Sequence, residues 1–259
     1  MVKPIIIIQA RTGSTRLPRK MVKPFFEDKN VLEILISRLK EVVDENYVKD
    51  IIVATTENVN DDAIAEICTK LSVKSYRGSE QDVLQRFIDT AESQNSNTII
   101  RICADNVFLD INSLKKLATY LNNTNDDYVS FRTKEGKPSI LTHYGFFAEG
   151  VTLAALKRVI KLTDSPLFHE HVTNRIHSYP LDFRVNLLPI EDFIPGLESY
   201  KDLRLTLDTM EDFDVQQKIY SDLVSRPDGL TPKEIIKYLD EEHPEFYDIM
   251  KSTINANKK

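Results

Sequence analysis

The sequence lacks long hydrophobic runs and has only two cysteines, and each shortage excludes a class of protein. None of its 259 residues belongs to a run of about 18 apolar residues. The four isoleucines in MVKPIIIIQAR are too few for a secretion signal or a spanning helix. We therefore expect a soluble, cytoplasmic protein that does not enter membranes. Cys68 and Cys103 cannot form a disulfide framework or a cysteine-based zinc site, so we expect both to be small core residues.

An excess of positive charge is also missing. Forty acidic residues outnumber 34 basic ones, which gives a net charge of −6. Such a chain has no general attraction to nucleic acid or to anionic lipid, so any basic site must be local. The content of hydrophobic residues (41%) and charged residues (29%) is typical of globular proteins and excludes a disordered chain.

Short β-branched runs alternate with helical patterns in the first half of the chain. This alternation predicts an α/β fold with a doubly wound, mostly parallel sheet. The expected strands are 5–8, 51–54, 73–76, 98–103 and 128–131. The expected helices are 31–43, 61–71, 81–92 and 111–121. Ligands bind beyond the carboxyl ends of the strands in such sheets, so we expect the site in the loops after Ile8, Ala54, Tyr76 and Cys103.

The alternation breaks after residue 131, where glycine and proline punctuate short segments. A strand pattern returns at 203–207 and a helical pattern at 211–224. We therefore expect one discontinuous domain over 1–259, with a core formed by 1–131 and 200–226 and an inserted lobe at 132–199. A helical tail is expected over 230–255, and the residues from Asn255 onward are expected to fray.

The first loop, QARTGSTRLPRK at residues 9–20, concentrates positive charge in an acidic chain. Its cations are Arg11, Arg16, Arg19 and Lys20, and its small residues are Gly13, Ser14 and Thr15. Guanidinium groups bind phosphate oxygens in pairs, and a lysine adds a point charge. The loop matches neither the Walker A pattern nor the dinucleotide fingerprint. We predict that it binds a polyphosphate; the alternative is a solvated basic turn.

Two aspartates follow predicted strands far apart in the sequence. Asp105 comes after 98–103 and Asp208 directly after 203–207, so both are expected at the ligand edge of the sheet. Carboxylates of this kind hold Mg²⁺ together with phosphate oxygens and water. The alternative is that each caps the following helix, although Asp110 is better placed than Asp105 to cap the helix at 111.

Six segments of the chain together match one known family. They are QARTGSTRLPRK, IVATTENVNDD at 52–62, YRGSEQDVLQRF at 76–87, Asp105, EHVT at 170–173 and RLTLDTMEDF at 204–213. The chain resembles the cytidylyltransferase family, which includes spore-coat polysaccharide biosynthesis proteins and relatives of acylneuraminate and 3-deoxy-manno-octulosonate cytidylyltransferases. The resemblance implies a Rossmann-like nucleotidyltransferase fold and Mg²⁺-dependent transfer of CMP from CTP, with release of pyrophosphate. It implies an acceptor that is a sugar acid, phosphate or phosphonate used in surface-glycan precursor synthesis, and a homodimer formed through the lobe.

The resemblance also implies roles for individual residues. In the family the opening loop wraps the triphosphate, which implies nucleotide contacts from Gln9, Ala10, Arg11, Gly13, Ser14, Arg16 and Lys20. The catalytic residues would be Arg11, Arg16, Lys20 and Asp105, and the metal ligands would be Asp105 and Asp208. Base or ribose contacts are implied for Thr55, Ser79 and Asp82, whereas an S-x-x-D helix cap explains the last two equally well. Acceptor contacts are expected from Glu149, His171 and Arg175.

The chain departs from the family pattern at several points. Arg19 stands where glycine is usual, so it either adds a phosphate contact or prevents a left-handed backbone that the loop needs. The sequence ADNVF replaces a Gly-Asp-Cys-Pro pattern around Asp105. The histidines at 169, 171 and 177 raise a zinc alternative, but their spacing favours exposed or capping roles.

The expected mechanism is in-line attack of an acceptor oxygen on the α-phosphorus of the nucleotide, which requires no side-chain nucleophile. Two further hypotheses stay open. The enzyme could use another nucleotide with a sugar 1-phosphate, or the protein could bind nucleotides without catalysis.

Overall fold

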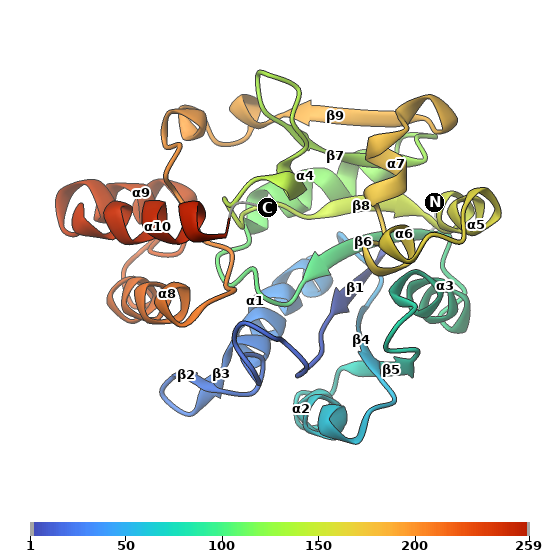
Figure 1. Ribbon diagram of the computed structural model, residues 1–259, viewed down its shortest axis with the longest axis horizontal. Helices are drawn as coiled ribbons and strands as arrows, with labels where there is room; N and C mark the ends of the chain where they lie inside the picture. Colours follow the sequence, from blue (N-terminus) through green and yellow to red (C-terminus); the bar gives the residue numbers. More distant parts are fainter. Residues whose placement is uncertain (1–2, 258–259) are drawn as a thin grey trace.

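A seven-stranded sheet forms the centre of the protein, whose computed structural model describes residues 3–257 (Figure 1). Its strands are β1 (Ile5–Gln9), β4 (Ile51–Thr56), β5 (Lys74–Gly78), β6 (Thr98–Cys103), β7 (Tyr128–Arg132), β8 (Glu149–Thr152) and β9 (Val185–Pro189). The strand order is β5-β4-β1-β6-β8-β7-β9, and only β8 runs antiparallel to its neighbours. The predicted α/β fold with a mostly parallel sheet is confirmed. A separate two-stranded ribbon pairs β2 (Pro24–Phe26) with β3 (Lys29–Asn30).

Helices cover both faces of this sheet (Figure 1). The helices are α1 (Val31–Asp44), α2 (Asp62–Lys70), α3 (Val83–Ser93), α4 (Ile111–Leu121), α5 (Leu153–Leu162), α6 (Pro166–Glu170), α7 (Asn174–Ser178), α8 (Met210–Leu223), α9 (Pro232–Glu241) and α10 (Glu245–Ala256). The last three lie together at one side of the sheet, where α8 packs against both α9 and α10 (Figure 1). The four helices expected in the first half are present within two residues of their predicted bounds.

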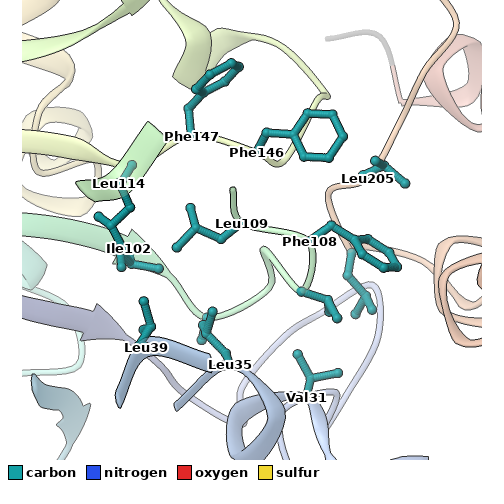
Figure 2. Packing of buried hydrophobic residues seen from close by; sticks show 14 of the residues in the cluster. Val31, Leu35, Leu39, Ile102, Phe108, Leu109, Leu114, Phe146, Phe147 and Leu205 are labelled. Atoms are coloured by element: carbon teal, nitrogen blue, oxygen red, sulfur yellow. The ribbon is translucent and has the colours of Figure 1, made fainter. Parts of the chain in front are cut away.

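Strand β1 shows how the sequence builds two cores. Its alternating side chains point to opposite faces, so Ile6 and Ile8 pack with α1 and α4, whereas Ile5 and Ile7 pack with α3 and α5. All four isoleucines are fully buried, and each contributes about 1.5–3 kcal/mol to stability. Figure 2 shows part of the larger core, which contains residues of α1 as well as Phe108, Phe146 and Leu205. The apolar run thus fixes β1 between two layers of helices.

The segment 203–207 is not the sheet strand that the sequence predicts. Strand β8 occupies the position beside β6, so the segment runs outside the sheet, and the backbone N–H of Leu205 donates to the carbonyl of His143 at 2.8 Å. The alternating leucines are nevertheless buried. Gly145 permits this close approach because it has φ +68°, and a Cβ there would lie 2.4 Å from the carbonyl oxygen of Leu205.

The region expected as an inserted lobe, 132–199, contributes β8 and β9 to the central sheet as well as α5, α6 and α7. The helical tail consists of α9 and α10. The expectation of fraying from Asn255 is wrong for the described part of the tail, because α10 continues to Ala256 and Asn257 bonds to the first loop. Residues 258 and 259 lie outside the described residues. Among residues 3–257, no helix has both the length and the apolar character needed to cross a bilayer.

Candidate active site

A cleft with two chambers lies at the carboxyl ends of β1 and β6. The loop chamber, of about 630 Å³, is lined by Gln9, Arg11, Ser14, Thr15, Arg16, Lys20, Met21, Val83, Ala104, Glu170 and Ala256. The lobe chamber, of about 470 Å³, is lined chiefly by residues of 139–147 and 171–177, with Arg101, Arg204 and Thr206. Both chambers share Arg16, Cys103, Asp105, His171, Asp208 and Asn257. The shared residues mark a junction where ligands of the two chambers would meet.

Lys20 joins the two candidate metal ligands at this junction. Its Nζ donates to Oδ2 of Asp105 at 2.8 Å, lies 3.6 Å from Oδ1 of Asp208, and also donates to the carbonyl of Leu207. Burial alone would lower the pKa of Lys20, but the two carboxylates outweigh this effect and raise it. The ammonium therefore stays charged, and the predicted convergence of the two aspartates is observed.

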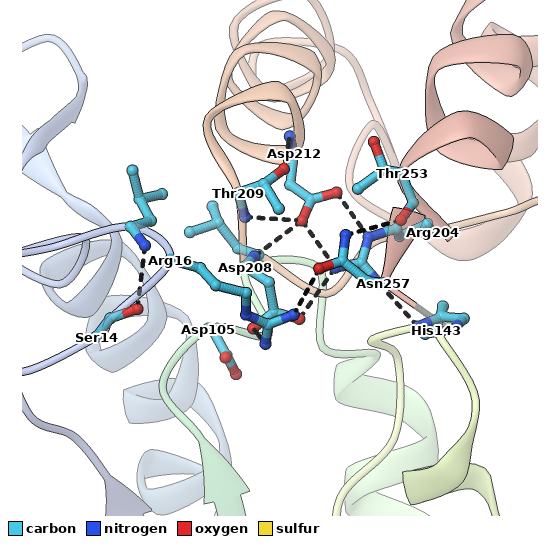
Figure 3. Close-up of polar contacts among 12 residues, drawn as sticks. Ser14, Arg16, Asp105, His143, Arg204, Asp208, Thr209, Asp212, Thr253 and Asn257 are labelled. Carbon is cyan, nitrogen blue, oxygen red and sulfur yellow. Dashed lines mark hydrogen bonds and ion pairs between the residues drawn. The ribbon is translucent and has the colours of Figure 1, made fainter. Parts of the chain in front are cut away.

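Arg16 approaches the junction from the same loop (Figure 3). Its Nη2 lies 2.8 Å from Oδ1 of Asp208, and its Nη1 donates to Oδ1 of Asn257 at 3.3 Å. Its side chain is half exposed to the cleft. Arg11 also lines the loop chamber, with its nearest carboxylate, that of Glu170, at 3.9 Å. Guanidinium groups that are exposed and only partly paired can bind an incoming anion.

The capping alternative does not explain either aspartate at the junction. Asp110 caps α4, because its carboxylate accepts from the backbone N–H of Ser113 at 2.9 Å. Thr209 caps α8 in a capping box with Asp212. Asp105 and Asp208 therefore point into the cleft without a capping role.

A buried arginine that sequence reasoning missed holds Asp208 from behind (Figure 3). Arg204 Nη2 lies 3.0 Å from Oδ2 of Asp208, and its Nε donates to Asp212 at 2.7 Å. Its Nη1 is 2.8 Å from Nδ1 of His143. Burial and then the charge of Arg204 lower the pKa of His143, which favours the neutral imidazole. The sequence does contain a signal for Arg204, because it is a charged residue within the apolar pattern LRLTL at 203–207.

The first loop is anchored by another missed residue, Asp61. Its Oδ1 accepts from the backbone N–H of Thr12 at 2.7 Å and from the Thr12 hydroxyl at 2.6 Å, and its Oδ2 accepts from the hydroxyl of Thr56. Burial would raise the pKa of Asp61, but these hydrogen bonds lower it overall. The buried carboxylate thus stays ionised and fixes the start of the loop against β4.

Arg19 resolves one alternative left by the sequence. It adopts φ +60°, so the loop does need a left-handed residue here, and arginine supplies it at a cost of about 1–2 kcal/mol relative to glycine. Its backbone N–H donates to the carbonyl of Thr12 at 3.0 Å and closes the loop. The side chain is exposed and does not line either chamber.

Of the three residues expected near the base or ribose, Ser79 and Asp82 cap a helix and Thr55 is buried. Asp82 caps α3 by accepting from the backbone N–H of Gln85 at 2.8 Å, and Ser79 Oγ accepts from the N–H of Asp82 at 2.9 Å. Thr55 is fully buried, and its hydroxyl has no hydrogen-bond partner within residues 3–257. The capping role is therefore present for Ser79 and Asp82, and nucleotide contacts from the three residues remain predictions.

Glu149 lies behind the wall of the lobe chamber, not in its lining. It pairs with Arg101 Nη1 and accepts from the hydroxyls of Tyr128 and Thr173, the latter at 2.9 Å. Arg101 Nη2 donates to Oε1 of Gln9 at 3.0 Å. Arg101, which sequence reasoning missed, therefore lines the lobe chamber, with Glu149 orienting it and offsetting its charge.

The other expected acceptor residues separate in space. His171 lies at the junction of the chambers, whereas Arg175 pairs with Asp182 at 2.5 Å, stacks on Tyr179 and lines neither chamber. His169 Nδ1 is 2.8 Å from Asp82. In the described range, 3–257, no three His, Cys, Asp or Glu side chains are grouped to hold a metal, so the zinc alternative has no support.

The two cysteines also differ from each other. Cys68 is buried in the core as expected, but Cys103 is only partly buried and lines both chambers. Burial raises the pKa of the Cys103 thiol to about 11. This thiol is therefore protonated at neutral pH and is a poor nucleophile.

Comparison with known proteins identifies the family. The family model described as cytidylyltransferase matches residues 5–247. The chain belongs to the cytidylyltransferase family. Its strand-end loop and its two converging aspartates lie within the matched region.

Similar proteins match over nearly the whole chain. An uncharacterized protein of Methanocaldococcus jannaschii is 38% identical over 92% of this chain and 90% of its own length. The spore coat polysaccharide biosynthesis protein SpsF of Bacillus subtilis is 31% identical over 91% of this chain and 93% of its own length. A solved cytidylyltransferase from Leptospira borgpetersenii is 27% identical, with a TM-score of 0.80, covering 95% of this chain and 97% of that one.

Proposed function

We propose that this protein transfers CMP from CTP to an anionic small-molecule acceptor and releases pyrophosphate. The observation that supports this most directly is the junction, where the Lys20 ammonium contacts Asp105 at 2.8 Å and lies 3.6 Å from Asp208. Cations and metal-binding carboxylates at the meeting point of two chambers suit transfer of a phosphoryl-linked group. The relation to a polysaccharide biosynthesis protein suggests that the product is a surface-glycan precursor.

The loop chamber would bind the triphosphate. Arg11, Arg16 and Lys20 line it together, and Ser14 adds a hydroxyl whose oxygen already accepts from the backbone N–H of Leu17 at 3.3 Å. A triphosphate carries several negative charges, which these three cations would offset. The anchoring of the loop by Asp61 keeps this arrangement ready before binding, which reduces the entropic cost of ordering the loop.

Asp105 and Asp208 fit a magnesium ion. Both supply hard oxygen donors, and their side chains are 24% and 22% exposed, so each reaches the cleft. Mg²⁺ is commonly held by one or two carboxylates, with water and phosphate oxygens completing its shell. The bound ion would supply positive charge to the phosphates. Lys20 and Arg16, which now neutralise these carboxylates, would then be available to phosphate oxygens.

The lobe chamber would bind the acceptor. Apart from the two shared aspartates, its lining has no carboxylate, whereas Arg101, His143, His177 and Arg204 contribute basic groups. Glu149 and Asp212 pair with Arg101 and Arg204, so the two guanidinium groups offer directed N–H donors more than net charge. Such donors suit an acceptor with a carboxylate, phosphate or phosphonate group, such as a sugar acid. Burial lowers the pKa of His177, so its neutral ring can both donate and accept hydrogen bonds with sugar hydroxyls.

The chemistry would be an in-line displacement at the α-phosphorus. An acceptor oxygen held in the lobe chamber attacks, the bond from the α-phosphorus to the bridging oxygen breaks, and pyrophosphate leaves along the loop chamber. A hydroxyl acceptor would release its proton to solvent, whereas a phosphate or phosphonate oxygen has no proton to lose. Lys20, Arg16 and Arg11 stabilise the charge that develops on the phosphates, so positioning supplies most of the rate. No side chain becomes covalently attached to the nucleotide.

Assembly as a homodimer and a cytoplasmic location remain predictions.

Pyrophosphate release tests this proposal. We expect release from CTP with Mg²⁺ and at least one acceptor from a panel of sugar acids, phosphates and phosphonates. Competition among the four nucleoside triphosphates should favour CTP. Asp105→Asn should lower turnover about 100-fold or more because it removes a charged metal ligand. Asp44→Asn makes the same change at an exposed site at the end of α1 and should leave turnover unchanged.

Two results would contradict the proposal. If CTP with Mg²⁺ neither binds nor raises the melting temperature, the nucleotide assignment fails. If Asp105→Asn remains as active as Asp44→Asn, the metal assignment fails. Binding of CTP without turnover over the whole acceptor panel would favour a protein that binds nucleotides without catalysis.

A further inference from the structure

The last turn of α10 forms part of the wall of the candidate active site, although the family match ends at residue 247. Ala256 lines the loop chamber, and Asn257 lines both chambers. The side chain of Asn257 accepts from Arg16 Nη1 at 3.3 Å, across a sequence separation of 241 residues (Figure 3). A segment outside the matched region therefore contacts a cation of the first loop.

The orientation of the Asn257 carboxamide is fixed by its own helix. Its Nδ2 donates to the carbonyl of Thr253 at 2.8 Å, which leaves Oδ1 facing the guanidinium of Arg16. The helix itself is held by Met250, which is buried in the main core, and by Tyr247, which stacks on Tyr200 with ring centroids 6.1 Å apart. The carbonyl oxygen is thus presented to Arg16 by a well-packed element.

We propose that Asn257 is a positioning residue for phosphate binding, a role that rests on the function proposed above for the loop chamber. Arg16 has two acceptors, the carboxylate of Asp208 at 2.8 Å and the neutral carboxamide of Asn257. An anion that competes for Arg16 must weaken the first contact, because the carboxylate neutralises the guanidinium. The second contact orients the guanidinium without offsetting its charge. Asn257 therefore holds Arg16 toward the phosphates and, unlike Asp208, offsets none of its positive charge.

The proposal predicts a definite order of effects for two substitutions. Asn257→Leu removes the acceptor without adding charge and should weaken phosphate binding about twofold, through lost orientation. Asn257→Asp places a carboxylate beside Arg16 and should weaken binding about fivefold or more, because a unit charge at this distance is worth about 1 kcal/mol even in water. The additional loss of phosphate affinity in Asn257→Asp, relative to Asn257→Leu, should shrink as salt is added.

A matched control is available on the same helix. Asn255 is exposed and lines neither chamber, so Asn255→Asp changes the net charge equally without a partner at Arg16. We expect its phosphate affinity to stay within about twofold of the wild type, since an exposed charge that makes no contact with Arg16 is strongly screened by solvent and salt.

Calorimetric titration of all four proteins with inorganic triphosphate and with CTP, each with Mg²⁺, tests the proposal. The expected order of affinity is wild type and Asn255→Asp, then Asn257→Leu, then Asn257→Asp, at unchanged melting temperature. In turnover, Asn257→Asp should raise the KM for CTP by the same factor and should also lower kcat, because Arg16 binds the phosphates in the ground state and stabilises the charge that develops on them in the transition state.

Three outcomes would overturn the proposal: equal affinities of Asn257→Asp and wild type for triphosphate, equal losses in Asn255→Asp and Asn257→Asp, or no triphosphate binding by the wild type. Binding of triphosphate but not CTP by the wild type, with the expected order among the variants, would instead refute the proposed function and support the role of Asn257.

Discussion

Replacing Arg204 should destabilise the protein and disturb the site at once. The guanidinium is 1% exposed, and it donates to Asp212 at 2.7 and 2.9 Å while bonding to Asp208 at 3.0 Å. Asp212 is itself 2% exposed, so Arg204→Met leaves a buried carboxylate without its cation. Breaking a buried pair on one side costs about 3–5 kcal/mol.

The expected loss lies at the lower end of that range. Asp212 keeps two backbone donors, the N–H groups of Asp208 and Thr209, at 2.9 and 3.0 Å. We therefore expect Arg204→Met to lower the free energy of unfolding by about 3 kcal/mol. In a chain of this size, that loss corresponds to a fall in melting temperature of about 6–12 °C.

Urea unfolding can separate the contribution of the ion pair to stability from the contribution of side-chain packing. The proteins to compare are wild type, Arg204→Met, Asp212→Asn and the double variant. The double variant has neither the buried guanidinium nor the buried carboxylate. Its loss of unfolding free energy should therefore be smaller than the sum of the two single-variant losses by about 1–3 kcal/mol. The pKa of His143 should also rise toward its usual value in Arg204→Met, since Arg204 helps to lower it, and NMR titration would detect this. A loss below about 1 kcal/mol, or strictly additive losses, would refute the reasoning.

Three further predictions follow from single contacts. Lys20→Gln removes the ammonium between the two aspartates, so CTP turnover should fall about 100-fold or more. Mn²⁺ measured without nucleotide should bind more tightly, because the ammonium no longer competes for the carboxylates. Weaker Mn²⁺ binding would count against a metal site there. Asp61→Asn should lower the free energy of unfolding, measured by urea denaturation, by about 2–4 kcal/mol. It should also speed hydrogen exchange at the backbone amide of Thr12. Unchanged exchange would show that Asp61 does not anchor the loop. The contact with Asp82 raises the pKa of His169 despite burial, so its stabilising effect should be complete below about pH 6.5 and lost as pH rises through the raised pKa. The difference in unfolding free energy between wild type and His169→Gln should therefore shrink between about pH 5.5 and about pH 9, and a difference that grows would contradict the pairing.

Local patterns in the sequence predict the central sheet and the place of the site well. The short β-branched run at residues 5–8 predicts a strand buried on both faces, which places the cations that follow it at the ligand edge, and the structure has this strand. Asp105 is placed correctly for the same reason. Asp208 reaches the junction although 203–207 is not a strand, because an extended segment buried by alternating leucines ends at the same edge.

The missed residues depend on contacts between distant segments. Asp61 reaches Thr12 across 49 positions, and Asn257 reaches Arg16 across 241, so no local periodicity could pair them. Arg101 and Arg204 do have a local signal, because each is a charged residue inside an apolar pattern. Such a residue must have a buried partner, and the partners are Glu149 and Asp212.

The central claim is that the two aspartates hold a divalent cation which meets the phosphates of CTP beside the first loop. A crystal structure with Mn²⁺ and CTP, using anomalous scattering to locate the metal, tests it most directly. We predict a manganese peak about 2.1 Å from carboxylate oxygens of both Asp105 and Asp208, with the triphosphate in contact with Arg16 and Lys20. A metal bound elsewhere, or phosphates lying outside the first loop, would contradict it.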